Sequence, residues 1–436
     1  MNKVKIQGGN MKNIDLVKYI DAKVFKDELW GKGKTFSLVN ESGESFEIEE
    51  FGSYLNRHPN LGGKQDIRIY DDYVTDFVNF EGSRIKQFFR VDSSCFQELL
   101  DEKKNNPKCS YVTCVDGLLE DGYVPEKISA ILMHCYPDKI EEENIEKFGA
   151  RMLNHFEVPS MFCEKLTCFN TKNEPEIFSV AVDFLKPNEI MMNLNDYMRQ
   201  YCNKLPKVWG LKNDIKDIIE CYEEIFREHY SRVKDGFGLQ EGFSLEDEIA
   251  QMKEDVAYAS LVRKHGLGDG DLFARNMGVV INKETNKISV APAYDFEAFV
   301  SHVETSLSFS FKYAYKFAKN FQVDPVKWIQ DYVRFNKDDG VTRKFIKDIT
   351  FMVNNYPNAV EKFVSKVNEL VAGSEDEGCK LDCFLDGLYS NSSIAGDSYI
   401  SEEDLELCKK DFKDNITMVR DVIEIFSGKD LQIEKE

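Results

Sequence analysis

Two short segments of the chain carry acidic and amide side chains at spacings that could do chemistry. In the first, Asp271 lies five residues before Asn276, and the apolar run Met277–Ile281 follows at once. In the second, Asp295 follows another apolar run that ends in Ala-Pro-Ala-Tyr. One carboxylate can align or deprotonate an attacking hydroxyl, while an amide oxygen and a second carboxylate can hold the magnesium that neutralises a triphosphate. The pattern therefore predicts a phosphoryl-transfer site.

The elements that precede these segments read as mostly strands with one prominent helix. Residues 35–39 and 45–49 alternate polar and apolar side chains around a turn, which predicts a hairpin. Apolar and β-branched runs predict four further strands, at residues 108–115, 128–135, 162–169 and 177–184. Between them, residues 138–153 place apolar side chains on one helical face.

From about residue 186 the apolar period changes from two to that of a helix. A helix is predicted from Ile215 to Val233, and Ser244 with Asp247 forms a capping-box pattern that opens another. Gly268 and Gly270 flank Asp269, which indicates a turn there. Beyond about residue 304 further helices are predicted, except that aromatic residues at odd positions from 309 to 317 favour a packed strand. We therefore expect an α+β fold of two lobes, a β-rich lobe at 1–185 and a helical lobe at 186–436.

Composition limits the classes of partner. The 436 residues carry a formal net charge of -21, which argues against a general surface for nucleic acid or anionic membrane. No apolar run approaches the roughly 20 residues that a membrane helix needs, and the N-terminus lacks the apolar region of a signal peptide. The 11 cysteines include no Cys-x-x-Cys pair, which favours reduced thiols in the cytoplasm over a zinc site.

Three segments of the chain resemble the HipA-like kinases, a branch of the protein-kinase fold related to phosphatidylinositol kinases. Residues 271–276 resemble the family's catalytic loop, and residues 290–295 its metal-binding strand end, which typically reads Pro-Ala-Tyr-Asp. Residues 143–159, followed by the strand that ends at 182–184, resemble its regulatory helix, Val-Pro turn and hinge. The likeness spans roughly residues 125 to 300.

The resemblance implies a role for each matching residue. Asp271 would position the acceptor hydroxyl, Asn276 and Asp295 would ligate Mg2+, and the backbone near Asp183 and Phe184 would meet the adenine of ATP. Glu143 or Glu146 would be the helix glutamate that pairs with a phosphate-contacting lysine.

The chain departs from the family's pattern at two points. Phe273 stands where the family often has a histidine. The strand at 128–135 contains no lysine, so Lys127, Lys139 or Lys86 would have to contact the phosphates instead, and the sequence does not choose among them.

The predicted function is an ATP- and magnesium-dependent kinase that phosphorylates Ser/Thr hydroxyls of a protein substrate or of itself. The missing lysine keeps a second interpretation open, a pseudokinase that binds nucleotide or a partner without turnover. A small molecule or a lipid headgroup is a third acceptor class. The resemblance alone also implies a toxin–antitoxin or secreted-effector setting, with an antitoxin-like or regulatory protein as partner and no direct contact with nucleic acid.

Overall fold

The computed structural model places two compact units. Unit 1 comprises Met1–Gln200, Gly278–Glu297 and Asn391–Ser398, and unit 2 comprises Tyr201–Met277, Ala298–Ser390 and Tyr399–Glu436. The residues that the structure describes are 35–39, 45–50, 86–135, 140–169, 175–186, 188–204, 206, 213–233, 243–270, 272–282, 284–295, 307–319, 324–374, 378–389 and 402–427. The predicted boundary between residues 185 and 186 stays a prediction.

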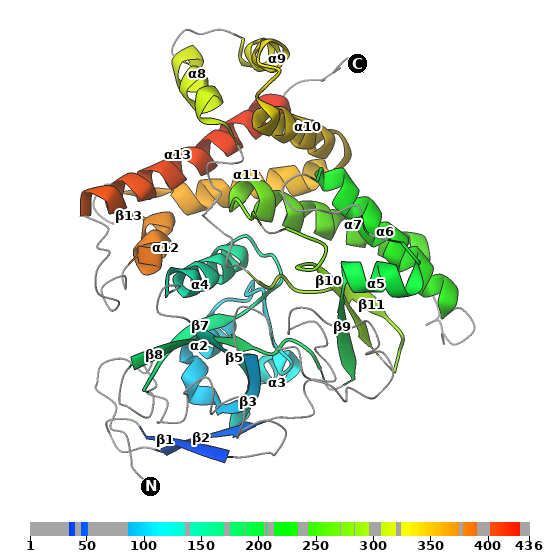
Figure 1. Ribbon diagram of the computed structural model, residues 1–436, viewed down its shortest axis with the longest axis vertical. Helices are drawn as coiled ribbons and strands as arrows, with labels where there is room; N and C mark the ends of the chain where they lie inside the picture. Colours follow the sequence, from blue (N-terminus) through cyan, green and yellow to red (C-terminus); the bar gives the residue numbers. More distant parts are fainter. Residues whose placement is uncertain are drawn as a thin grey trace. The chain divides into compact units, whose positions relative to one another are not determined.

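Unit 1 is built on an antiparallel sheet in the order β1-β2-β3-β5-β8-β7 (Figure 1). Its strands are β1 Thr35–Val39, β2 Ser45–Glu50, β3 Lys86–Asp92, β5 Lys127–Cys135, β7 Cys163–Phe169 and β8 Pro175–Val182. The predicted hairpin at 35–49 and three of the four further strands are thereby confirmed. The strand predicted at 108–115 is wrong for most of its length, because only Tyr111–Val112 (β4) is extended and pairs with Ser160–Met161 (β6).

Helix α4, Ile140–His155, connects β5 to β7 and confirms the predicted helix. Phe148, Met152 and Leu153 are buried on it, which accounts for the apolar spacing read from the sequence. The chain leaves the helix through Glu157 at a φ of 56°, and the amide of Val158 donates to the carbonyl of Leu153 at 2.9 Å. Such a left-handed residue commonly ends a helix. Two shorter helices, α2 Gln97–Asn105 and α3 Asp116–Glu120, precede β5.

A smaller antiparallel sheet completes unit 1, in the order β11-β10-β9. Its strands are β9 Glu189–Asn193, β10 Gly278–Asn282 and β11 Ile288–Val290, and helix α5, Leu194–Tyr201, follows β9. Gly278 is required in β10, because a Cβ there would come within 2.7 Å of the carbonyl oxygen of Met192.

The described part of unit 2 is mainly helical. Its helices are α6 Ile215–Arg232, α7 Leu245–Leu261, α8 Phe309–Lys319, α9 Pro325–Phe335, α10 Gly340–Asn355, α11 Pro357–Val371, α12 Lys380–Tyr389 and α13 Glu402–Ser427. Helix α6 packs on α7, and α11 contacts α7, α10 and α13 (Figure 1). Ser244 caps α7 by accepting the amide of Asp247 at 3.3 Å, as the capping-box pattern predicted.

The strand predicted for the aromatic residues 309–317 is wrong, because these residues form α8. Phe311 and Tyr315, four residues apart, are buried and stack with ring centroids 5.8 Å apart, and both rings contact Trp328 of α9. Tyr313 and Phe317 are 70% and 61% exposed. Alternation in the sequence therefore marks two faces of a helix, and the contact with α9 decides which of them is buried.

With an antiparallel sheet in unit 1 and helices in unit 2, the predicted α+β class is confirmed. None of the helices described by the structure is long and apolar enough to cross a membrane.

Candidate functional site

Asp295 is held at the end of the small sheet of unit 1. Two residues before it, the amide of Ala293 donates to the carbonyl of Pro159 at 2.8 Å, and the carbonyl of Ala293 accepts the amide of Met161 at 2.9 Å. Asp295 itself is half-buried and adopts a φ of 60°. An aspartate tolerates this left-handed conformation better than most residues do. The left-handed residue Asp295 thus comes two residues after a segment that is hydrogen-bonded to residues 159–161.

The second candidate segment of unit 1 follows β8. Asp183 is fully buried, its Oδ1 accepts the amide of Leu185 at 2.9 Å, and its carbonyl accepts the amide of Cys114 at 2.8 Å. Burial raises the pKa of the Asp183 carboxyl well above its ordinary value, because backbone hydrogen bonds offset only part of the cost of removing a charge from water. Phe184 is buried beside it.

Both segments of unit 1 are preceded by residues that are hydrogen-bonded to the same stretch of backbone, Met161 and Phe162. The carbonyl of Phe162 accepts the amide of Val182 at 3.0 Å, one residue before Asp183. The preceding residue, Met161, donates to Ala293, two residues before Asp295. Consecutive residues thus hold the approaches to Asp183 and Asp295, which lie 112 positions apart in the sequence. No local pattern in the sequence could have shown this pairing.

The loop that carries the other two candidates belongs to unit 2. Asp271, the predicted catalytic residue, lies outside the described residues. Around it, Leu272 and Asn276 are buried, and the amide of Asn276 closes a turn onto the carbonyl of Phe273 at 2.8 Å. The guanidinium carbon of Arg275 lies 5.2 Å from the centroid of the Phe273 ring. Phe273, where the resembled family often has histidine, thus takes part in a cation–π contact.

The loop is anchored by a π-helix, Val262–Gly266, into which α7 continues. A π-helix is uncommon and often marks a functional region. Its three basic side chains, Arg263, Lys264 and His265, are all buried. Because a buried charge is costly unless it is paired, each of them needs a partner within the fold.

Arg263 finds its partner inside the loop. Its Nε lies 2.7 Å from Oδ2 of the fully buried Asp269, and the amide of Asp269 donates to the carbonyl of Arg263 at 2.9 Å. The chain turns at Gly268, where φ is 63°. The turn expected around Asp269 is present, but the side chain of Asp269 is an ion-pair partner that sequence reasoning missed. An arginine six residues ahead of a Gly-flanked aspartate was the available signal.

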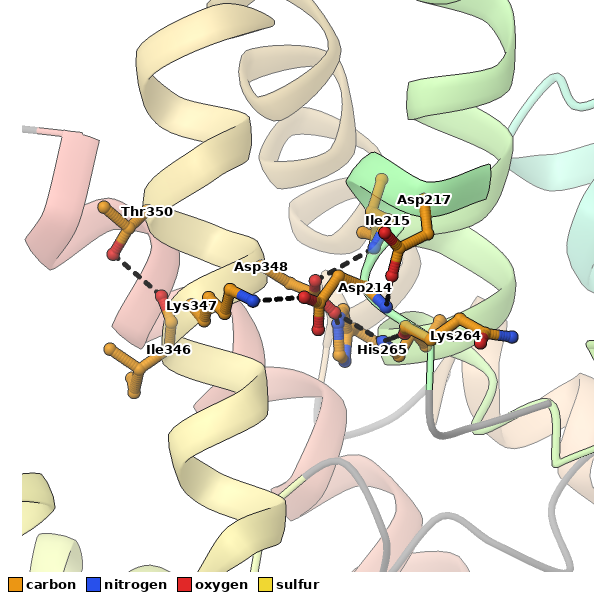
Figure 2. Close-up of polar contacts among 10 residues, drawn as sticks. Asp214, Ile215, Asp217, Lys264, His265, Ile346, Lys347, Asp348 and Thr350 are labelled. Carbon is orange, nitrogen blue, oxygen red and sulfur yellow. Dashed lines mark hydrogen bonds and ion pairs between the residues drawn. The ribbon is translucent and has the colours of Figure 1, made fainter. Parts of the chain in front are cut away.

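Lys264 and His265 share one carboxylate, that of Asp348 on α10 (Figure 2). Nζ of Lys264 lies 2.5 Å and Nε2 of His265 2.9 Å from Oδ2 of Asp348, whose Oδ1 accepts the amide of Ile215 at 3.0 Å. Lys264 also donates to the carbonyl of Asn213. One carboxylate therefore joins the π-helix, the start of α6 and the middle of α10.

The charges of this cluster follow from its contacts. Burial on its own raises the pKa of Asp348, but the hydrogen bond from His265 and the charge of Lys264 outweigh burial, so that the pKa lies below its ordinary value. Burial lowers the pKa of His265 more than the Asp348 carboxylate raises it. We conclude that Asp348 is ionised and His265 neutral at pH 7, with the proton of His265 on the nitrogen that faces the carboxylate.

The glutamates and lysines considered for the phosphate contact are in part described. Glu146 on α4 is buried, whereas the side chain of Glu143 is not described. Lys127 is the first residue of β5 and the only lysine of that strand. The side chains of Lys127 and Lys86 are not described, and Lys139 lies outside the described residues. The choice among the three lysines stays open.

A different lysine, Lys147 on α4, forms an ion pair with the buried Glu164 of β7. Its Nζ also lies 3.9 Å from Oε2 of Glu98. Burial lowers the pKa of Lys147, and the charge of Glu164 opposes that shift. The pair joins helix and strand as the expected lysine–glutamate pair would, but with the lysine on the helix and the glutamate on the strand.

The chemistry of the predicted ligands fits Mg2+, because amide and carboxylate oxygens are the hard donors that this ion prefers. Asn276 belongs to unit 2 and Asp295 to unit 1. Within the described ranges, no group of three or more His, Cys, Asp or Glu side chains gathers as a metal site. The pairing of Asn276 with Asp295 stays a prediction.

Comparison with known proteins adds little to this description. No family model and no curated protein matches the sequence. Among solved structures, the chain is similar to the crystal structure of a Helicobacter pylori proinflammatory kinase, CtkA, with a TM-score of 0.36 and 10% identity over 70% of this chain and 88% of that chain. A likeness at this TM-score and identity supports neither a fold nor an activity for this chain.

Proposed function

We propose that the protein is a phosphotransferase that uses ATP and Mg2+ to phosphorylate Ser/Thr hydroxyls of a protein, its own included. The observation that supports this most is the backbone linkage of Met161 and Phe162 to the approaches of Asp295 and Asp183. Adenine at the segment after β8 and a metal-bound phosphate at Asp295 would then be positioned by one rigid piece of unit 1.

Each residue has a defined task in this proposal. Bound magnesium would neutralise the phosphate oxygens, with Asn276 and Asp295 supplying its oxygen ligands. Asp271 would accept a hydrogen bond from the acceptor hydroxyl and align its oxygen with the transferred phosphoryl group. The pair Arg263–Asp269 and the carboxylate of Asp348 would act through the loop backbone, as positioning groups that keep Asp271 and Asn276 in place.

Phosphate transfer from radiolabelled ATP, with Mg2+ and several protein acceptors, tests the proposal. We expect label on the protein or on an acceptor, and its loss in Asp271→Ala and in Asp295→Ala. Asp338→Ala is the matched control, because this exposed carboxylate lies in the turn before α10 and has no assigned task. The proposal is wrong if the folded wild-type protein transfers no phosphate to itself or to any protein acceptor, or if both aspartate variants retain full transfer.

A specific observation favours a second candidate, a pseudokinase. Strand β5 has its one lysine at its first residue, with Ile131 in its middle. Without a lysine at the phosphates, the fold could bind nucleotide yet fail to turn it over. A rise in the midpoint of thermal unfolding with ATP and Mg2+, without any transfer, would support this candidate.

A further inference from the structure

An exposed apolar patch lies at the end of helix α3 in unit 1. Leu118, Tyr123 and Val124 are 45%, 59% and 48% exposed, and we call them the 118–124 patch. Single scattered exposed apolar residues are normal, whereas apolar residues that form one contiguous exposed surface with a polar rim are typical of interaction sites. None of the three candidate segments of the proposed active site, at Asp183, at residues 271–276 and at Asp295, includes these residues.

The backbone brings Leu118 and Tyr123 together. The amide of Tyr123 donates to the carbonyl of Leu118 at 2.8 Å, and the amide of Gly122 donates to the carbonyl of Leu119 at 3.1 Å. Gly122 adopts a φ of 76°. This is a Schellman motif, in which the residue two positions beyond the helix end usually packs against the third-last helical residue. Here those two residues are Tyr123 and Leu118.

Hydrogen bonds fix the backbone on both sides of the patch. Before it, the amide of Cys114 donates to the carbonyl of Asp183, and the Thr113 hydroxyl donates to Oδ1 of Asp116 at 2.8 Å. After it, the carbonyl of Glu126 accepts the amide of Ser93 at 3.0 Å. A surface whose backbone is fixed in advance loses little entropy when it binds a partner.

The patch is also open and rimmed by negative charge. A Cβ built at Gly117 or at Gly122 would meet no atom within 4 Å. The carboxylates of Glu120, Asp121 and Glu126 are exposed, and within the described part of the chain none of the three takes part in an ion pair. From Asp116 to Glu126 the sequence contains four acidic residues and no basic one.

We propose that the 118–124 patch is a docking surface for a basic segment of a partner protein, in which an apolar side chain is flanked by lysine or arginine. The apolar side chain would cover Leu118 and Tyr123, and the basic ones would approach Glu120, Asp121 and Glu126. Phosphate-bearing partners do not fit, because the carboxylates repel them. The docking is independent of the proposed phosphate transfer, so either can fail without the other.

The test uses the full chain and a fluorescein-labelled peptide in which Lys-Arg pairs alternate with single Leu or Phe residues. Binding is measured by the fluorescence anisotropy of the peptide at an ionic strength of about 0.15 M. We expect saturable binding of this peptide and at least about tenfold weaker binding of a matched peptide with Ser for Leu and Phe. Leu118→Ser combined with Tyr123→Ser should weaken binding of the first peptide by about tenfold or more. Glu120→Lys combined with Asp121→Lys should do the same.

The control is Asp338→Lys combined with Glu361→Lys, which changes the net charge equally at exposed positions of unit 2. We expect it to bind within about twofold of the wild type, because neither carboxylate belongs to the segment that carries the patch. Equal weakening by the control would show nonspecific attraction to an acidic protein and overturn the proposal. Unchanged binding by the Leu118/Tyr123 variant would overturn the proposal as well. So would a dimer, detected by sedimentation velocity, that the patch variants abolish, because a second copy of the chain would then occupy the patch.

Discussion

Two buried aspartates, Asp348 in unit 2 and Asp183 in unit 1, have opposite electrostatic environments. Both are almost completely removed from solvent. Asp348 faces the ammonium of Lys264 and the imidazole of His265, and its pKa is lowered although burial raises it. Asp183 accepts backbone amides, and burial leaves its pKa well above the ordinary value. Burial alone therefore does not decide whether a carboxyl is charged; the charge of its neighbours does.

The two regions also differ in the interactions that fix their backbone. The π-helix before the loop is held by the carboxylate of Asp348, which pairs with Lys264 and also bonds to His265 and to the amide of Ile215. The segment at Asp183 is fixed mainly by backbone hydrogen bonds within its own unit. A change of charge should therefore disturb the first region much more than the second.

The largest expected effect is that of Asp348→Ala. Removing this carboxylate leaves Lys264 as a buried cation without its partner, and breaking a buried pair in this way typically costs about 3–5 kcal/mol. Urea unfolding followed by circular dichroism measures the change in free energy of unfolding. Adding Lys264→Met to Asp348→Ala should recover part of the loss, because the buried ammonium that lost its carboxylate is then absent as well. Asp338→Ala, the exposed control, should stay within about 0.5 kcal/mol of the wild type.

The pH dependence of stability sharpens the contrast between the two aspartates. The folded pKa of Asp348 is lowered, so its stabilisation is present above the unfolded value of about 3.9 and is lost as the pH falls through the folded pKa. The folded pKa of Asp183 is raised, so its contribution is present below about 3.9 and is lost as the pH rises through the folded value.

Urea unfolding of Asp348→Asn and of Asp183→Asn from about pH 2 to 7.5 should therefore show opposite trends. The deficit of Asp348→Asn should grow as the pH rises to about 4 and stay constant above it, whereas Asp183→Asn should gain on the wild type as the pH rises above about 4. Parallel curves for the two variants would contradict the assignment of charge. The effect should be smaller than that of Asp348→Ala, because an amide keeps one acceptor oxygen.

A packing change next to the charged cluster tests whether the π-helix depends on charge alone. A Cβ at Gly266 would come within 3.0 Å of Cε2 of Phe363 on α11, so Gly266→Ala forces the ring or the helix to move. Overpacking of this kind typically costs about 1–3 kcal/mol. We expect a lower midpoint of thermal unfolding with an unchanged pH profile. Gly117→Ala, at an open position in unit 1, is the matched control.

The smallest expected effect is at the far end of α7. Ser244→Ala removes the side chain that accepts the amide of Asp247, and loss of such a cap costs about 1 kcal/mol. Ser244→Asp should restore most of it, because a carboxylate also caps a helix. If Ser244→Ala were as damaging as Asp348→Ala in urea unfolding, the capped start of α7, and not the buried carboxylate, would be the main anchor of the loop.

The sequence by itself determined most of the regular elements that the structure describes, and the α+β class. Alternation over residues 35–49 and the helical spacing of residues 215–233 specify local geometry, because each side chain's direction follows from the backbone period. The same reasoning failed at residues 309–317, where aromatic residues at every second position suit a strand or the two faces of a helix. Only the contact of Phe311 and Tyr315 with α9 distinguishes these possibilities.

Only part of the candidate site could be predicted from the sequence. Asp271, Asn276 and Asp295 were recognised as candidates by their spacing, since each follows or precedes a short apolar run. The partner of Lys264 could not be predicted, because Asp348 lies 84 residues further along the chain and neither residue has a local pattern that indicates burial. A charged side chain is stable in the interior only where another part of the fold provides a residue of opposite charge. Tertiary contacts therefore decide which charges are buried, and no single segment of the sequence specifies them.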